Sequence, residues 1–222
     1  MAGIGHSAIF VPSPGKQLPI SGEQRSMTGK RSLSGSKPET PQPVADGGGV
    51  DLACLRDMHP RLPPDMAAVM VTRAALGLQR NKHSSGTALE IDIEAVVLCF
   101  ILRWPDADPS TAKQHDFNRI TEDGAEAIAL AVAHKTKSWR VVRRMQREEY
   151  ADWLLEHQES GARRLVALEV SGVDRGSIAA RLKDELAQVA KSTDVDQRWA
   201  GVVGFQKPKA ALQSLEVRTD DR

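Results

Sequence analysis

Two acidic residues, Asp152 and Glu169, are the strongest candidates for chemistry in this sequence, because each adjoins apolar residues. Asp152 precedes Trp153, and Glu169 follows the continuous apolar run at 165–168. A charge buried without a partner is very costly. Each carboxylate is therefore expected to hold a cation, to pair with an arginine, or to lie at an exposed strand end.

A pair of carboxylates on neighbouring strands indicates a site for a divalent metal ion. Mg²⁺ prefers hard oxygen ligands and is often held by one or two carboxylates together with waters and a substrate phosphate. Such an ion lowers the pKa of a bound water and neutralises charge on a phosphate under attack. In the structural alternative, Glu169 pairs with an arginine such as Arg143, Arg144 or Arg175, and Asp152 ends a turn.

The elements that would position these residues are predicted in the segment 116–210. Thr121 is a favourable N-cap, and the next two residues are acidic, which suits the start of a helix. The pattern predicts, in order, a helix at 121–135, strands at 138–147, 151–156 and 165–168, a helix at 177–191 and a strand at 199–205. This order predicts an α/β fold with a mixed sheet flanked by helices.

That order and these acids resemble the core of the restriction-endonuclease-like superfamily, also called PD-(D/E)XK nucleases, over residues 116–206. The resemblance implies an Asp on the second strand, here Asp152, and an acid on the third strand, here Glu169. It also implies a Glu on the first helix, for which Glu126 and Glu122 both qualify. These acids would hold Mg²⁺ for cleavage of DNA.

The sequence departs from the pattern of that superfamily at Ser171, where the resemblance implies a lysine that orients or activates the attacking water. Ser171 supplies no positive charge, but its hydroxyl could form a hydrogen bond near the metal. Lys183, on the predicted helix that follows, could reach back toward the site instead. The hypothesis therefore covers an active nuclease and a catalytically degenerate nucleic-acid-binding derivative.

A run of basic residues lies on the first predicted strand. Strand alternation places Arg143 and Arg147 on one face and Arg140 and Arg144 on the other. Such a patch would bind the phosphate backbone of a nucleic acid. Charges that protect an edge strand from pairing explain the same run equally well.

The N-terminal part of the chain is predicted to differ from this core. Residues 1–49 are rich in Gly, Pro and Ser and are expected to be a disordered tail. Residues 50–110 are expected to be a helical segment that could bind a protein partner. Within it, residues 87–104 alternate like a strand but also suit a helix, which we prefer because their apolar run is unbroken. Residues 211–222 are expected to fray.

Composition restricts the remaining function classes. The chain has 222 residues with 30 Lys and Arg against 29 Asp and Glu, so no global charge points to nucleic acid or membrane. No signal peptide or membrane span is apparent, which predicts a soluble, cytoplasmic protein. The two cysteines and scattered histidines do not make a zinc site, and P-loop and Gly-x-Ser-x-Gly motifs are absent. A regulatory α/β protein that is not an enzyme is the alternative to a nuclease.

Overall fold

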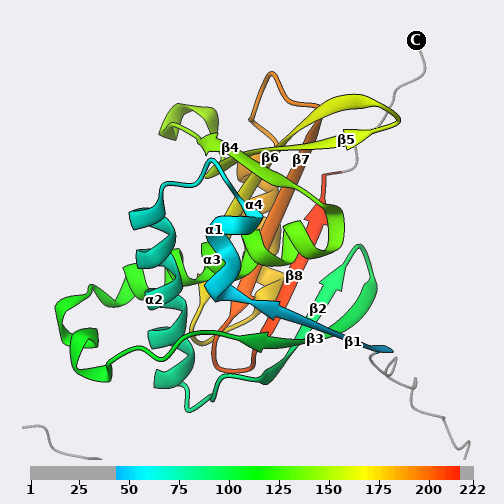
Figure 1. Ribbon diagram of the computed structural model, residues 1–222. Coiled ribbons are helices and arrows are strands. Elements are labelled where there is room, and N and C mark those ends of the chain that lie inside the picture. The colour runs from blue at the N-terminus through cyan, green and yellow to red at the C-terminus, as the bar shows by residue number, and fades with distance from the viewer. Residues whose placement is uncertain (1–43, 216–222) are drawn as a thin grey trace, which may run out of the picture. The chain divides into compact units, whose positions relative to one another are not determined.

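A computed structural model describes residues 44–215, and Figure 1 shows how their elements are arranged. The strands form one sheet in the order β1-β3-β2-β8-β7-β6-β5-β4. They span Val44–Asp51 (β1), Thr87–Ile93 (β2), Val96–Arg103 (β3), Arg140–Arg144 (β4), Trp153–Glu159 (β5), Ala162–Val173 (β6), Gln197–Gly204 (β7) and Lys209–Ser214 (β8). The helices span Leu55–Met58 (α1), Pro64–Arg80 (α2), Phe117–Lys137 (α3) and Ile178–Val189 (α4), with 3₁₀ turns at Leu52–Cys54 (η1), Pro109–Gln114 (η2) and Arg147–Glu149 (η3).

The predicted order of helix, strand, strand, strand, helix and strand is confirmed between α3 and β7. Strands β4, β5 and β6 form an antiparallel meander. Helix α4 then crosses over so that β7 pairs with β6 in parallel, with Leu168 opposite Trp199. The chain therefore has the predicted α/β architecture, a mixed sheet flanked by helices.

The two faces of the sheet are covered by different helices, with α1, α2 and α3 on one side and α4 on the other (Figure 1). Strand β7 shows the division, because its side chains alternate between the faces. Trp199 and Val203 belong to the core under α3, whereas Ala200 and Val202 pack with Leu182 of α4. Within the described residues, no helix is long and apolar enough to cross a membrane.

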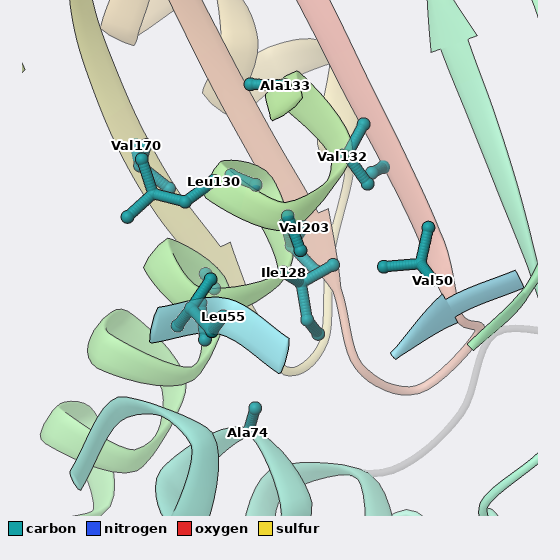
Figure 2. Close-up of a cluster of buried hydrophobic side chains, with 14 of the residues drawn as sticks. Val50, Leu55, Ala74, Ile128, Leu130, Val132, Ala133, Val170 and Val203 are labelled. Atoms are coloured by element: carbon teal, nitrogen blue, oxygen red, sulfur yellow. The ribbon is translucent and has the colours of Figure 1, made fainter. Parts of the chain in front are cut away.

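Helix α3 is the centre of the larger core. Every residue from 123 to 133 is buried, and Figure 2 shows Ile128, Leu130 and Val132 among apolar residues from the strands and α1. Gly124 allows α2 to lie close, because a Cβ there would be 2.9 Å from the Cα of Ala74. A helix on the surface of a domain usually buries only one face, whereas this part of α3 is buried on all sides. Close neighbours on every side explain why it is rich in small apolar residues.

The start of α3 differs from the prediction. Asp116, and not Thr121, is the N-cap, and its carboxylate accepts from the backbone N–H groups of Asn118 and Arg119 at 2.9 and 3.2 Å. Thr121 lies in the second turn, where its hydroxyl donates to the carbonyl of Phe117. The helix therefore begins four residues before the predicted start, and its first turn lines a groove described below.

The preferred helix at 87–104 is wrong, because this segment is a β-hairpin. Strands β2 and β3 pair antiparallel and are joined by a two-residue turn at Glu94 and Ala95. Leu89 and Ile91 are fully buried, in line with the alternation that the sequence also contained. Strand β3 pairs with β2 and β1, and of its apolar run only Phe100 and Leu102 are buried. Of the predicted helical segment 50–110, α1 and α2 are helical, whereas residues 50–51 belong to β1 and the hairpin accounts for 87–103.

Both ends of the folded region extend beyond the predicted core. Strand β1 begins at Val44, inside the predicted tail, and pairs in parallel with β3; residues 1–43 lie outside the described residues. Strand β8 occupies 209–214, part of the predicted frayed end, and pairs with β7 and β2. Because β8 joins the hairpin to the meander, the segment 50–110 is part of the same sheet as the core and not a separate unit.

Candidate functional site

The structure brings Asp152 and Glu169 together at the start of β5. The backbone N–H of Asp152 donates to the carbonyl of Leu168 at 3.2 Å, and Oδ2 of Asp152 accepts from the N–H of Val170 at 2.9 Å. Glu169 lies between these two residues of β6. The pair depends on antiparallel pairing of β5 and β6, which places Trp153 opposite Leu168. Asp152, directly before β5, and Glu169 of β6 are therefore neighbours in the fold.

Glu169 is buried, with 7% of its surface exposed, and only one of its oxygens is satisfied. Oε1 accepts a hydrogen bond from Nε2 of Gln188 on α4 at 2.6 Å, whereas Oε2 is buried without a hydrogen-bond partner. Burial is the largest cause of a pKa of about 9 for Glu169; the nearby carboxylates of Asp152, Glu185 and Glu126 contribute to the rise, and Arg181 acts against it. Without a cation, this carboxyl is uncharged near neutral pH.

Asp152 is in a similar environment. Burial raises its pKa, while the hydrogen bond from Val170 and the charge of Arg144 act in the opposite direction. The exposed carboxylate of Glu122 on α3 raises the pKa of Asp152 as well. Within the described residues, no ion pair engages Asp152 or Glu169, so a cation that binds the pair would displace the proton of Glu169.

Glu126 is the acid of α3 that lies near this pair, but it has a partner of its own. It is 4% exposed, and Oε1 accepts from Nη2 of Arg144 at 2.8 Å, whereas Oε2 is buried without a partner. The pKa of Glu126 is raised to about 7, chiefly by burial and also by Asp152, while the charge of Arg144 acts against the rise. Of the two candidates on the first helix, Glu126 is thus the buried one and Glu122 the exposed one.

A fourth acid, Glu185 on α4, was not singled out in the sequence. It is 4% exposed, and its Oε1 lies 2.5 Å from Nε of Arg181, one turn earlier on the helix. Burial raises the pKa of Glu185, and Arg181 opposes this effect. The signal was present as a polar stripe, because Arg181, Glu185 and Gln188 recur at helical spacing beside the apolar residues of α4. Only the apolar stripe was used in the prediction.

Arg181, and not Lys183, is the cation near Ser171. Nε of Arg181 donates to the Ser171 hydroxyl at 2.7 Å. Lys183 is exposed and lies about 160° around α4 from Glu185, at 100° per residue. The expectation that Lys183 reaches back toward the site is therefore wrong. The buried hydroxyl of Ser171 instead accepts from the guanidinium group of Arg181.

The predicted basic strand is an edge strand in which carboxylates hold two of the four arginines. Strand β4 ends the sheet, and a bulge interrupts its pairing with β5 between Val141 and Arg143. Arg143 donates twice to Glu149, at 2.7 and 2.6 Å, and Arg144 pairs with Glu126. These ion pairs favour the interpretation that the charges protect the edge strand from pairing with another strand.

The two remaining arginines do not form a continuous basic surface with them. Arg140 is exposed on β4, whereas Arg147 lies beyond the strand, in η3. The predicted alternation through Arg147 fails because the strand ends at Arg144. Among residues 44–215, no ion pair engages Arg140 or Arg147, so these two remain available to a phosphate.

An open groove of about 630 Å³ lies beside the acidic residues. Its walls come from the first two turns of α3, the end of β6 with the following loop, and the first turns of α4. Glu122, Ser171 and Arg181 lie on its margin toward the acids. The other lining residues are Phe117, Asn118, Thr121, Gly172, Val173, Asp174, Arg175, Gly176, Ser177, Ala180 and Asp184.

The close approach of β6 to α3 shapes this groove. A Cβ at Gly172 would lie against the carbonyl oxygen of Thr121 and 2.7 Å from its methyl group. Only a residue without a side chain fits there. Gly172 therefore keeps the end of β6, and with it Ser171, next to the N-terminal turns of α3.

Glu126, Asp152, Glu169 and Glu185, called the acidic row below, lie near one another, because the other three all raise the pKa of Glu169. Arg144 forms an ion pair with Glu126 and Arg181 with Glu185, whereas within the described residues Asp152 and Glu169 have no ion pair. In the part of the chain that the structure describes, no three acidic, histidine or cysteine side chains are arranged to hold a metal ion. Glu126 is thus not in position as a third ligand. The donors fit an ion held by two carboxylates and completed by water, since Oε2 of Glu169 has no partner.

Comparison with protein-family models, with curated proteins and with solved structures finds no match to this chain. Functional inference therefore rests on the geometry of the acidic pair and the groove beside it.

Proposed function

We propose that this protein is a divalent-metal-dependent phosphodiester hydrolase acting on DNA, with a restriction-endonuclease-like core. The observation that carries the proposal is the pair Asp152 and Glu169, neighbours in the fold, mostly buried and, within the described residues, without an ion pair. A structural ion-pair network would give each buried carboxylate a partner. A cation is the partner that this pair lacks.

The arrangement of the elements supports the same proposal. The order from α3 to β7 is the order on which the resemblance to the superfamily rests. Asp152 comes from the start of the second strand of this unit and Glu169 from its third strand, the positions that the resemblance implies. Glu126 comes from the first helix and lies close enough to raise the pKa of Glu169.

In this proposal, Asp152 and Glu169 would hold Mg²⁺ or Mn²⁺, with waters and a phosphate oxygen as the other ligands. The ion would supply Lewis-acid stabilisation and a bound water of lowered pKa. The charge of Arg144 lowers the pKa of both Asp152 and Glu126, which favours their ionised forms. Gln188 holds Oε1 of Glu169 and so fixes the orientation of that carboxylate.

Arg181 supplies the positive charge that the resemblance assigns to a lysine. It is half exposed on the groove side and donates to Ser171, the residue at the lysine position. A guanidinium there would stabilise charge on the phosphate. Because Arg is protonated at all relevant pH values, Arg181 would act as a fixed charge and not as a proton acceptor.

A nuclease assay tests the proposal. Single-stranded, double-stranded and nicked DNA, with RNA in parallel, are incubated with Mg²⁺ or Mn²⁺, and the products are separated on denaturing gels. Cleavage is expected for the wild type and is expected to fall at least 100-fold in Asp152→Asn and Glu169→Gln. Glu148→Gln, which changes an exposed acid in η3, is the matched control and should retain activity. Equal activity in Asp152→Asn and wild type would contradict the proposal.

The second candidate function is a catalytically degenerate domain that binds nucleic acid without cutting it. The observation that favours it is Ser171, a neutral residue where the resemblance implies a catalytic lysine. This candidate predicts saturable DNA binding without cleavage under either metal. Cleavage that depends on Asp152 would exclude it.

A third proposal is that the protein binds a partner protein and has no enzymatic activity. Much of the segment expected to contact a protein partner, 50–110, already packs within this protein. Helix α2 packs on α3, and the β2–β3 hairpin lies inside the sheet. Capture of a partner would therefore have to use the outer surfaces of these elements or the residues before Val44. Pulldown with a chain lacking residues 1–43 separates these two contacts.

A further inference from the structure

An exposed aromatic ring lines the groove, and a cation lies over one of its faces. Phe117, the first residue of α3, is 41% exposed and lines the groove. The guanidinium carbon of Arg80, at the end of α2, lies 3.2 Å from the centroid of this ring. Oδ2 of Asp174 accepts from Nη2 of Arg80 at 3.2 Å, and Oδ1 accepts from Nδ2 of Asn81 at 3.0 Å. The ring is thus supported on one face by a guanidinium that is itself fixed.

The position of this ring relative to the acidic row is set by α3. Phe117 and Glu126 are nine residues apart, which is about 14 Å along the helix axis. Thr121 and Glu122 lie on the turns between them and also line the groove. Stacked nucleotides rise about 3.4 Å each, so the ring is about four stacked nucleotides from the acids.

We infer that the groove binds single-stranded nucleic acid, with an unpaired base stacked on Phe117 and the strand running toward Asp152 and Glu169. The inference rests on the proposed function and names its substrate class. An aromatic ring at the wall of a groove is a platform for stacking, because every base has a π face. In a duplex the bases are already stacked on their neighbours and are not presented to such a ring.

The charges along the groove fit a strand that enters along its α4 side. Arg175 is 83% exposed in its side chain, and the guanidinium of Arg181 is half exposed, so both can contact phosphates. Glu122 and Asp184 border the same groove and would repel a phosphate. Binding is therefore expected to be tighter when a divalent cation offsets these acids.

Fluorescence anisotropy tests the inference with a labelled oligothymidylate and with its duplex with oligoadenylate. Ca²⁺ replaces Mg²⁺, and a gel verifies that the probe stays intact. The wild type should bind the single strand more tightly than the duplex. Phe117→Ala should weaken single-strand binding by about 5- to 150-fold, the range expected for one stacked base. Phe117→Tyr keeps a ring and should bind within about twofold of wild type.

Tyr150→Ala is the matched control, because Tyr150 is also an exposed aromatic residue with a cation over its ring, and it lies outside this groove. It should leave binding unchanged, and melting temperatures should show that all variants fold. Equal affinity for the two probes, or an equal effect of Phe117→Ala and Tyr150→Ala, would overturn the inference. Phe117-dependent binding without any cleavage would keep this inference and contradict hydrolysis. Cleavage of DNA together with single-strand binding that Phe117→Ala does not change would keep hydrolysis and contradict this inference.

Discussion

Asp152 is tied to the backbone beside its acidic neighbour, because its carboxylate accepts a hydrogen bond from the N–H of Val170, the residue directly after Glu169. One oxygen of Asp152 is thereby fixed against β6. Glu169 is fixed in the same way by Gln188. Both acids therefore have one oxygen held in place, the preorganisation that the proposed metal site would need.

Stability should fall as the pH rises from about 5 to 9 when the protein is kept free of divalent ions. The pKa of Glu169 is raised from 4.5 to about 9, and that of Glu126 from 4.5 to about 7. An acid with a raised pKa binds more protons in the folded state than in the unfolded state at these pH values, so deprotonation favours unfolding. Urea denaturation at several pH values, with a chelator present, measures the effect.

Glu169→Gln is the comparison for this pH dependence. The amide cannot ionise, so the variant should lose less stability between pH 5 and pH 9 than the wild type. Mn²⁺ should reduce the loss in the wild type, where it can bind the ionised pair, but not in Glu169→Gln. A pH dependence that is the same in both proteins would show that Glu169 does not carry it.

Arg144→Met should destabilise the protein by about 1–3 kcal/mol, because Glu126 would lose its hydrogen-bond partner while it stays buried. The methionine keeps most of the packing over Trp153. Adding Glu126→Gln should recover part of the loss, since the buried group is then neutral. Chemical denaturation measures all three proteins, and a double variant no more stable than Arg144→Met would contradict the pairing.

Gly172→Ala should destabilise the protein by about 1–3 kcal/mol or more, because the new methyl group would overlap the backbone and side chain of Thr121. The change would also push β6 away from α3 at the groove. Gly201→Ala is the control, since a Cβ there meets its nearest neighbour, Ala129, at an ordinary 3.7 Å. Thermal unfolding of the two variants compares them directly, and equal melting temperatures would argue against the close approach.

Ala95→Gly should stabilise the protein by about 0.5–1 kcal/mol. The turn between β2 and β3 places Glu94 and Ala95 at positive φ, 51° and 68°, where a residue with a side chain is strained. Glycine adopts this conformation without strain. Ala187→Gly, at an exposed position of α4, should instead lose about 1 kcal/mol because glycine disfavours a helix. Urea denaturation should give a higher free energy of unfolding for Ala95→Gly and a lower one for Ala187→Gly than for the wild type.

The local sequence pattern was sufficient to predict those helices and strands that pack against elements close to them in the sequence. The order from α3 to β7 follows from apolar spacing and turn residues, and the meander of β4, β5 and β6 brings Asp152 beside Glu169 without long-range information. The same locality explains why these two acids were recognised. Glu126 was also recognised, but its partner Arg144 was not distinguished from the other arginines of the strand.

Long-range pairing decided what local pattern left open. The segment 87–104 suits a helix or a strand by its own residues, and it is a hairpin because β8 and β1 provide hydrogen-bond partners on either side. Residues 211–214 of β8 belong to the segment predicted to fray, yet Ala210 and Leu212 are fully buried between β7 and β2. The spacing of six residues does not encode pairing with two strands that are distant in the sequence.

The sequence by itself determined the α/β class, the order of elements from α3 to β7 and the placement of two acids in consecutive elements, because these depend on periodicity and short connections. Tertiary structure alone decided that Glu185 and Arg181 join the acidic row and that Lys183 does not. The reason is physical: α4 is amphipathic, and only its packing against β6 and β7 selects which of its polar residues face the sheet and which face solvent.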